Sequence, residues 1–273
     1  MEWWGNSNFG SLLLYPAYVQ DYLDRVTAND VLGGNTQGLE RGVTDAFNVV
    51  LQELVADTIL GVSGGVIAQA ASKSKAMPFM CGARTITGCL TPVVGPAPTN
   101  FNFTGLDYSR KTGLFGNAST RYLNANRNNT EDPVNRHLAV YQTTPATNDG
   151  FVLIGTANVT GRSSIVRITN LSARITASSG SFPTVSQSGS AGFVGGVRTS
   201  SESITLRNGG VSITASVPSQ TPASAPIGVF ANGDGASACN ARISYYSIGE
   251  TLDIAILDAR VTLLMNTLAG LTI

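Results

Sequence analysis

The sequence predicts a mainly β protein, a jelly-roll sandwich with helices before and after it. From about residue 77, short segments rich in Val, Ile, Thr and aromatic residues alternate with Gly, Pro and Asn. Closely spaced segments of this kind, without helical periodicity between them, are typical of β-sandwiches and jelly rolls. Apolar residues recur at helical intervals only in the first quarter of the chain and at its end.

These changes in periodicity divide the chain into three predicted parts. Residues 1–75 form an N-terminal helical segment, residues 76–249 the β-sandwich, and residues 250–273 an amphipathic C-terminal helix. The helix packs either on the sandwich or on a neighbouring subunit. At 273 residues the chain is long enough for one substantial core with an appended segment.

Two helices are predicted in the N-terminal segment. After Pro16, which suits the start of a helix, Tyr18, Tyr22 and Val26 recur at four-residue spacing. A second, clearer apolar stripe consists of Leu39, Val43, Phe47, Val50 and Leu54. Helices this short cannot bury such a face alone, so we expect the pair to pack on the later domain, on other copies or on another protein.

Two hairpins are predicted in the β-rich part. In residues 203–216, Ile204 and Leu206 alternate with polar residues, "NGG" follows, and Val211 and Ile213 resume the alternation. An Asn-Gly turn supplies the positive φ that a tight hairpin needs. The same pattern around residues 232–235 predicts a second hairpin.

The C-terminal helix carries two apolar rows. Ser247 and Glu250 have the spacing of a capping box at its start. The first row has the alternating spacing of a coiled-coil seam and consists of Ile254, Leu257, Val261, Leu264 and Leu268. The second consists of Leu252, Ile256, Ala259 and Leu263. We expect one row to mediate self-association, the alternative being that both rows are buried within one subunit.

The composition excludes several classes of partner. Seventeen basic residues balance seventeen acidic ones, so no net field draws the chain to nucleic acid or anionic lipid. The first ten residues lack a basic and an apolar region, and we expect no signal peptide and no membrane insertion. Cys81 and Cys89 can be bridged geometrically, but buried, reduced thiols are the favoured interpretation.

No catalytic motif is present. A nucleophilic triad would have to use His137, which stands at the start of a predicted strand without a G-x-S-x-G motif. No zinc-ligand cluster and no glycine-rich nucleotide motif occur, so we expect no metal, no cofactor and no enzymatic activity. Loop carboxylates keep a polysaccharide depolymerase open as a less favoured alternative.

Four blocks of the sequence point to a known family. They are "CGARTITGCLTPVVGPAPTNFNF", "LDYSRKTGLFGNASTRYLNANRNN", "DPVNRHLAVY" and "NARISYYSIGETLDIAILDARVTLLMNTL". In these blocks, across about residues 59–268, the chain resembles bacteriophage tail-fibre or virion appendage proteins. Members of that family carry a concanavalin A-like (laminin G-like) jelly roll.

The resemblance implies a noncatalytic sandwich made in the bacterial host cytoplasm, displayed on the virion surface and often homotrimeric. Upstream of about residue 38 the resemblance stops, and this part would dock on other phage tail or capsid proteins. The expected virion anchor consists of Trp3, Trp4, Tyr15 and Tyr18, because aromatic side chains fill partner pockets well. The alternative is that the two tryptophans fold back onto their own chain.

One polar loop raises the question of ligand binding. Side-chain amides and guanidinium groups suit glycan hydroxyls, and the candidates here are Asn124, Asn126, Arg127, Asn128 and Asn129. Asn is equally suited to loops that need left-handed geometry or local hydrogen bonds, and this interpretation is favoured. The resemblance to phage appendage proteins makes a tail fibre or receptor-binding appendage for host attachment the leading function. The alternative is a capsid decoration or tail adaptor with no host-binding role.

Overall fold

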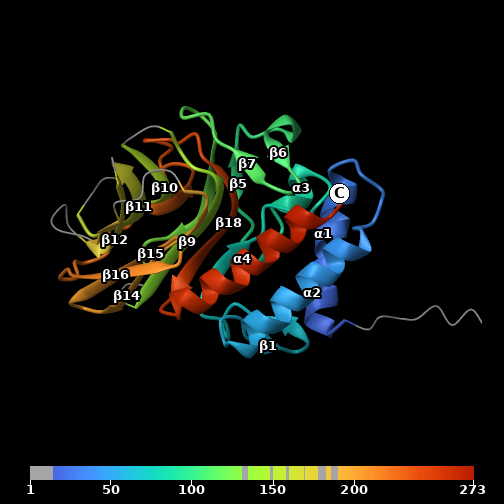
Figure 1. Ribbon diagram of the computed structural model, residues 1–273, viewed down its shortest axis with the longest axis horizontal. Coiled ribbons are helices and arrows are strands. Elements are labelled where there is room, and N and C mark those ends of the chain that lie inside the picture. The colour runs from blue at the N-terminus through green and yellow to red at the C-terminus, as the bar shows by residue number, and fades with distance from the viewer. Residues whose placement is uncertain are drawn as a thin grey trace, which may run out of the picture.

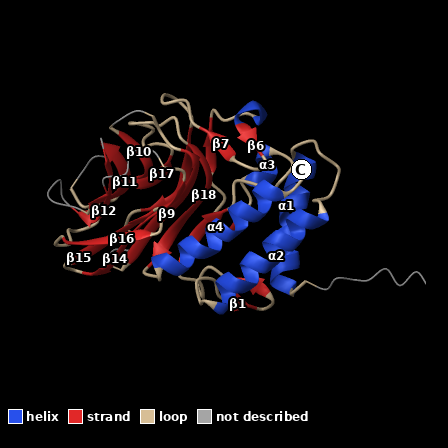
Figure 2. Ribbon diagram, in the orientation of Figure 1, coloured by secondary structure: helices blue, strands red, loops and turns tan. Residues whose placement is uncertain are grey.

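A computed structural model describes residues 15–130, 135–147, 150–157, 160–168, 170–177, 183–185 and 190–273. Two antiparallel sheets pack face to face, and helices cover the outer face of the larger sheet (Figures 1 and 2). The mainly β fold with helices before and after the sandwich is as the sequence predicts.

The smaller sheet has seven strands. Their spatial order is β13 (Thr184–Val185), β12 (Asn170–Ala177), β11 (Arg162–Ile168), β10 (Phe151–Gly155), β17 (Pro226–Val229), β8 (Tyr122–Asn128) and β5 (Thr99–Phe101). All its pairings are antiparallel. This arrangement leaves one face of the sheet for the core and turns the other away from it.

The larger sheet has nine strands. Seven follow the order β16 (Val211–Ser216), β15 (Ser203–Asn208), β14 (Gly192–Ser200), β9 (Arg136–Thr144), β18 (Arg242–Glu250), β3 (Ser74–Pro78) and β4 (Pro92–Val94). The other two are β6 (Tyr108–Ser109) and β7 (Gly113–Phe115), with β7 also pairing with β18. A separate two-stranded hairpin consists of β1 (Val62–Ser63) and β2 (Val66–Ile67).

At β14 the nine-stranded sheet is covered on both faces. Gly195 and Gly196 are neighbours on β14 and face opposite ways. A Cβ added to Gly195 would lie 2.7 Å from a side-chain atom of Ile254, in the C-terminal helix. One added to Gly196 would lie 2.8 Å from Ala173 in the other sheet. Both glycines therefore permit close approach of the layers on either side.

The hairpin predicted for residues 203–216 is present, with a different turn. Asn208 pairs with Val211, so the two turn residues are Gly209 and Gly210, both with positive φ. Two consecutive residues of this geometry match the twist of the flanking strands. The strand β16 forms the edge of the sheet, which leaves Val211 half-exposed.

The second predicted hairpin is wrong. A tight turn does occur at residues 232–235, where the N–H of Gly235 donates to the carbonyl of Asn232. The strands on either side, β17 and β18, however, belong to different sheets. The turn therefore lies in a connection between the two layers of the sandwich.

Five helical elements accompany the sheets in the described part of the chain. They are α1 (Ala17–Leu32), α2 (Arg41–Ala56), α3 (Ile86–Cys89), the 3-10 turn η1 (Gly105–Asp107) and α4 (Ile254–Gly270). The predicted stripe of α2 is buried from Val43 to Leu54. Of the three possibilities open for the helical pair, the structure shows packing on the chain's own sandwich.

A run of aromatic rings connects the N-terminal helices to the larger sheet. The ring centroids of Tyr22 and Phe47 are 5.4 Å apart, those of Phe47 and Phe79 5.8 Å, and those of Phe79 and Tyr245 5.1 Å. These rings lead from α1 through α2 to β18. Helices and sandwich therefore share one continuous hydrophobic core.

The predicted oligomer seam on the C-terminal helix is buried inside the chain. None of its residues exceeds 6% exposure; they are Ile254, Leu257, Val261, Leu264 and Leu268. Figure 1 shows α4 running over the larger sheet with α2 beside it. The expectation that this row meets a neighbouring chain is wrong, because the sheet and α2 already cover it. Any self-association must use another surface.

The start of α4 also differs from the prediction. Ser247 and Glu250 belong to β18, so they form no capping box. The helix is capped instead by Asp253, whose carboxylate accepts hydrogen bonds from the N–H groups of Ala255 and Ile256.

The three cysteines are free and buried, in agreement with the favoured interpretation. Within the described ranges, no helix has the length and apolar character of a membrane span. The same residues contain no cluster of three or more His, Cys, Asp or Glu side chains arranged to hold a metal ion.

Candidate functional site

The single histidine lies inside the protein. His137 is fully buried on β9, with its Nε2 2.7 Å from the Oγ of Ser247 and its Nδ1 2.6 Å from the carbonyl oxygen of Glu250. Ser247 is also buried and lies within hydrogen-bond distance of Ser74. This Ser–His pair joins strands of the larger sheet, and its burial keeps both side chains away from any external substrate.

Three of the five predicted glycan-contact residues order their own loops. The Oδ1 of Asn124 accepts a hydrogen bond from the N–H of Asn126 at 2.8 Å, and Nδ2 of Asn126 donates to the carbonyl of Ala97 at 2.7 Å. The Oδ1 of Asn128 accepts from the N–H of Thr130 at 3.0 Å. Asn126 has a φ of 54°, the left-handed geometry that favours Asn in loops.

The other two residues of that set are buried. Asn129 has no exposed surface, and its Nδ2 donates to the carbonyl of Gly161 at 2.9 Å. Arg127 is buried as well. Asn129 therefore supports the junction between two loops, and the hypothesis that it contacts a glycan is wrong.

The predicted virion anchor is only partly within the described residues. Trp3 and Trp4 lie outside them. The Tyr15 hydroxyl donates a hydrogen bond of 2.6 Å to Asp45 on α2, and Tyr18 packs, half-buried, against the core. The two tyrosines thus contact their own chain.

A polar hollow of about 240 Å³ lies on the face of the seven-stranded sheet that is turned away from the core. It is lined by Gly150, Val152, Arg162, Ser164, Val166, Arg174, Asn232 and Ser237. We call it the arginine pocket.

Strand alternation explains why these residues meet. On β11, Ser163 and Ile165 point into the core, so Arg162 and Ser164 project from the opposite face. In the register of the sheet, Ser164 stands opposite Arg174 on β12. The polar connection after β17 supplies Asn232 to the pocket wall.

Arg162 is the unusual member of the pocket. Its side chain is buried, and its Nε has no hydrogen-bond partner among the described residues. The hydroxyl of Ser164 is likewise buried without a partner among the described residues. By contrast, the buried Arg198 donates to the carbonyls of Ile175 and Val217. A buried cation without such partners is costly, which makes Arg162 a candidate binding residue.

Two arginine side chains, Arg162 and Arg174, line the pocket. Burial lowers the pKa of Arg162, because the charged guanidinium loses water contacts. Burial, with a smaller contribution from the Arg162 charge, lowers the pKa of Arg174 to about 10. With a pKa of about 10, Arg174 still carries a proton at neutral pH. A carboxylate can accept paired hydrogen bonds from a guanidinium, so an anion in the pocket could bind Arg162 in this way.

Comparisons with known proteins give a fold resemblance only. No family model matches the chain, and no curated protein matches its sequence. The resemblance to bacteriophage appendage proteins therefore stays a prediction from the sequence.

Several solved structures are similar in architecture. The botulinum neurotoxin serotype D binding domain aligns with a TM-score of 0.45 and 10% identity, over 70% of this chain and 51% of that chain. Domain 4 of AbnA, a GH43 extracellular arabinanase from Geobacillus stearothermophilus in complex with arabinotriose, aligns with a TM-score of 0.42 and 10% identity. The alignment covers 72% of this chain and 99% of that chain. The botulinum neurotoxin DC binding domain in complex with SialylT aligns with a TM-score of 0.35 and 17% identity, over 56% of this chain and 42% of that chain.

The chain thus spans less than half the length of some of these structures. Its fold class follows from its own strand pairing.

The sequence did not reveal the arginine pocket. Arg162 and Arg174 lie twelve residues apart, within segments that read as ordinary strands. One signal was present: arginine at outward positions of two successive β-segments places charge on one face of a sheet. It predicts a pocket only when the register of the two strands and the connection that covers them are known.

Proposed function

We propose that this protein is a noncatalytic carbohydrate-binding β-sandwich that recognises an acidic sugar in the arginine pocket. The observation that carries the proposal is the buried side chain of Arg162, whose Nε has no partner among the described residues. Beside it, Arg174 adds a second charge. A ligand carboxylate would supply the partner that Arg162 lacks.

The remaining lining suits a sugar better than a small inorganic anion. Val152 and Val166 pair across β10 and β11 and give the pocket an apolar area. A sugar ring has apolar C–H faces as well as hydroxyl groups. The polar side chains of Ser164, Asn232 and Ser237 can bind those hydroxyls.

The test is calorimetric titration of the full chain with glucuronic acid, galacturonic acid and N-acetylneuraminic acid, each against a neutral sugar. We expect at least one acid to bind and its neutral counterpart to bind at least about tenfold more weakly, the equivalent of losing one charge-assisted hydrogen bond. Arg162→Gln should weaken binding of the acid by a similar factor.

Arg41→Gln is the matched control, because Arg41 is 74% exposed and lies on α2, in a different layer. Its affinity should equal that of the wild type. If acetate or phosphate binds as tightly as the sugar acids, the pocket binds anions without recognising the sugar, and the proposal is wrong. Absence of binding by every acid would contradict the proposal.

The proposed setting is the surface of a bacteriophage particle, where such binding would serve host attachment. This rests on the resemblance of the four sequence blocks. Gold-labelled antibody against the protein, imaged on intact particles, is the test. Label on fibres or the tail tip supports host attachment, label over the head favours a capsid decoration, and unlabelled particles contradict a virion location.

A further inference from the structure

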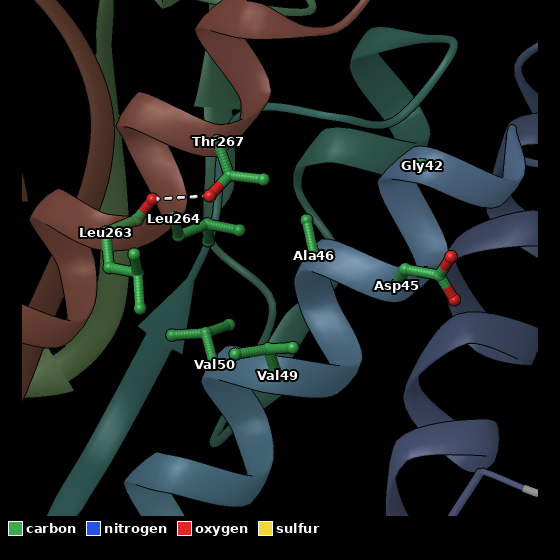
Figure 3. A pocket seen from close by; sticks show the side chains of 8 residues that line it. All are labelled: Gly42, Asp45, Ala46, Val49, Val50, Leu263, Leu264 and Thr267. Carbon is green, nitrogen blue, oxygen red and sulfur yellow. Dashed lines mark hydrogen bonds between the residues drawn. The ribbon is translucent and has the colours of Figure 1, made fainter.

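An apolar groove lies between α2 and α4, on the helical side of the molecule. Figure 3 shows Val49 and Val50 of α2 and Leu263 and Leu264 of α4 bordering it. Its volume is about 200 Å³, and Gly42, Asp45, Ala46 and Thr267 complete the lining. The groove is separate from the arginine pocket, which lies on the opposite layer.

The groove exposes apolar side chains that the described residues leave uncovered. Val49 is 47% exposed and Leu263 is 42% exposed. One such side chain would need no explanation, but these two line the same groove, one on each of two adjoining helices. Contiguous apolar surface of this kind marks a contact site.

The chain itself supplies an apolar segment, residues 1–14, that is followed by a residue beside the groove. The Tyr15 hydroxyl donates to Asp45, and Asp45 lines the groove. The fourteen residues before Tyr15 are rich in large apolar side chains, namely Trp3, Trp4, Phe9, Leu12, Leu13 and Leu14. Fully extended, fourteen residues reach about 46 Å, whereas a helix with its side chains is only about 10 Å wide. Length therefore does not prevent the segment from reaching the groove.

We propose that residues 1–14 dock in the groove between α2 and α4 of the same chain, with Trp3 and Trp4 as the anchoring side chains. Burial of one aromatic side chain removes about 150–250 Å² of surface from water, so two can cover a hollow of this size. Tyr15, which directly follows the segment, is held against α2 by its hydrogen bond to Asp45. A partner that binds the same two tryptophans would have to displace them from the groove.

Tryptophan fluorescence reads this contact directly, because Trp3 and Trp4 are the only two tryptophans in the chain. In the full-length protein we expect emission at shorter wavelength, and weaker quenching by acrylamide, than in a free peptide of residues 1–14. Val49→Asp should shift the emission to longer wavelength and raise the quenching towards that of the peptide.

Val211→Asp is the matched control, because Val211 is 51% exposed on the edge strand β16, away from the groove. It should leave the emission unchanged. Both substitutions are at exposed residues, and circular dichroism checks that each variant is folded. Wild-type emission and quenching equal to those of the free peptide would overturn the proposal.

A serial dilution followed by light scattering identifies the occupant. Docking within one chain predicts emission that is independent of concentration in a monomeric sample. Emission that shifts to longer wavelength as a dimer dissociates would instead assign the groove to a second copy, and would overturn the proposal. Unchanged emission in Val49→Asp would place the tryptophans elsewhere and would also overturn it.

Discussion

Glu40 illustrates how one side chain can join segments that are far apart in the sequence. It stands directly before α2, and its carboxylate accepts hydrogen bonds from Arg110 and pairs with Arg84 at 2.9 Å. The hydrogen bonds from Arg110 are the main cause that lowers its pKa from 4.5 to about 2. The ionised carboxylate thus fixes the start of α2 to the loops around the larger sheet.

This shift predicts a pH-dependent contribution to stability. Because the pKa is lower in the folded chain, the contribution is complete above about pH 4.5 and is lost as pH falls towards 2. Glu40→Gln should lower the free energy of unfolding by about 1–3 kcal/mol at neutral pH, and by progressively less in acid. Urea unfolding across this range measures it, with the exposed Glu202→Gln as the control. A difference that does not shrink in acid would contradict the interpretation.

Residue-scale prediction from the sequence succeeded where the role is local. The interpretation of the Asn-rich loop as loop geometry agrees with the hydrogen bond from the N–H of Asn126 to Asn124. Prediction from the sequence missed Arg162. This residue stands out because its buried Nε has no hydrogen-bond partner among the described residues of the folded chain, and no local pattern contains that information.

At the scale of the element, α4 tests how its two apolar rows are used. Leu257 is fully buried within the chain, whereas Leu263 is 42% exposed. Leu257→Ala should therefore destabilise the protein by about 2–5 kcal/mol, and Leu263→Ala by less than about 1 kcal/mol. Urea unfolding at two protein concentrations should give the same midpoints. Midpoints that rise with protein concentration for the wild type but not for Leu257→Ala would contradict this interpretation. They would indicate that the row containing Leu257 contacts a second subunit.

Elements with local signals were the most predictable from the sequence. The stripe of α2 and the hairpin β15–β16 depend on spacing and on two glycines, and both are present. The assignment of β17 and β18 to different sheets depends on pairing with distant strands, which no local pattern contains. The capping box failed for a similar reason, since Ser247 is part of β18 and contacts His137.

The whole molecule places its two candidate contact sites on different outer layers. The arginine pocket opens from the seven-stranded sheet, and the apolar groove lies in the helical layer beyond the nine-stranded sheet. A ligand in the pocket and a segment in the groove would therefore not compete for space. The arginine pocket and the apolar groove lie on either side of one continuous hydrophobic core, which the helices and both sheets share.

That shared core predicts a single cooperative unfolding transition, in place of the separate behaviour that a division at residue 75 would give. Phe47 on α2 packs against Phe79 on the other side of that division, so removing the helices would expose part of the core. Calorimetry should show one transition with an enthalpy of about 180 kcal/mol near 60 °C, the value for the residues from Tyr15 onward unfolding as one unit. Circular dichroism of the backbone and of the tyrosines should give the same midpoint, because neither layer retains a core without the other. Two resolved transitions, or a van 't Hoff enthalpy well below the calorimetric value, would restore the helical segment as an independent unit.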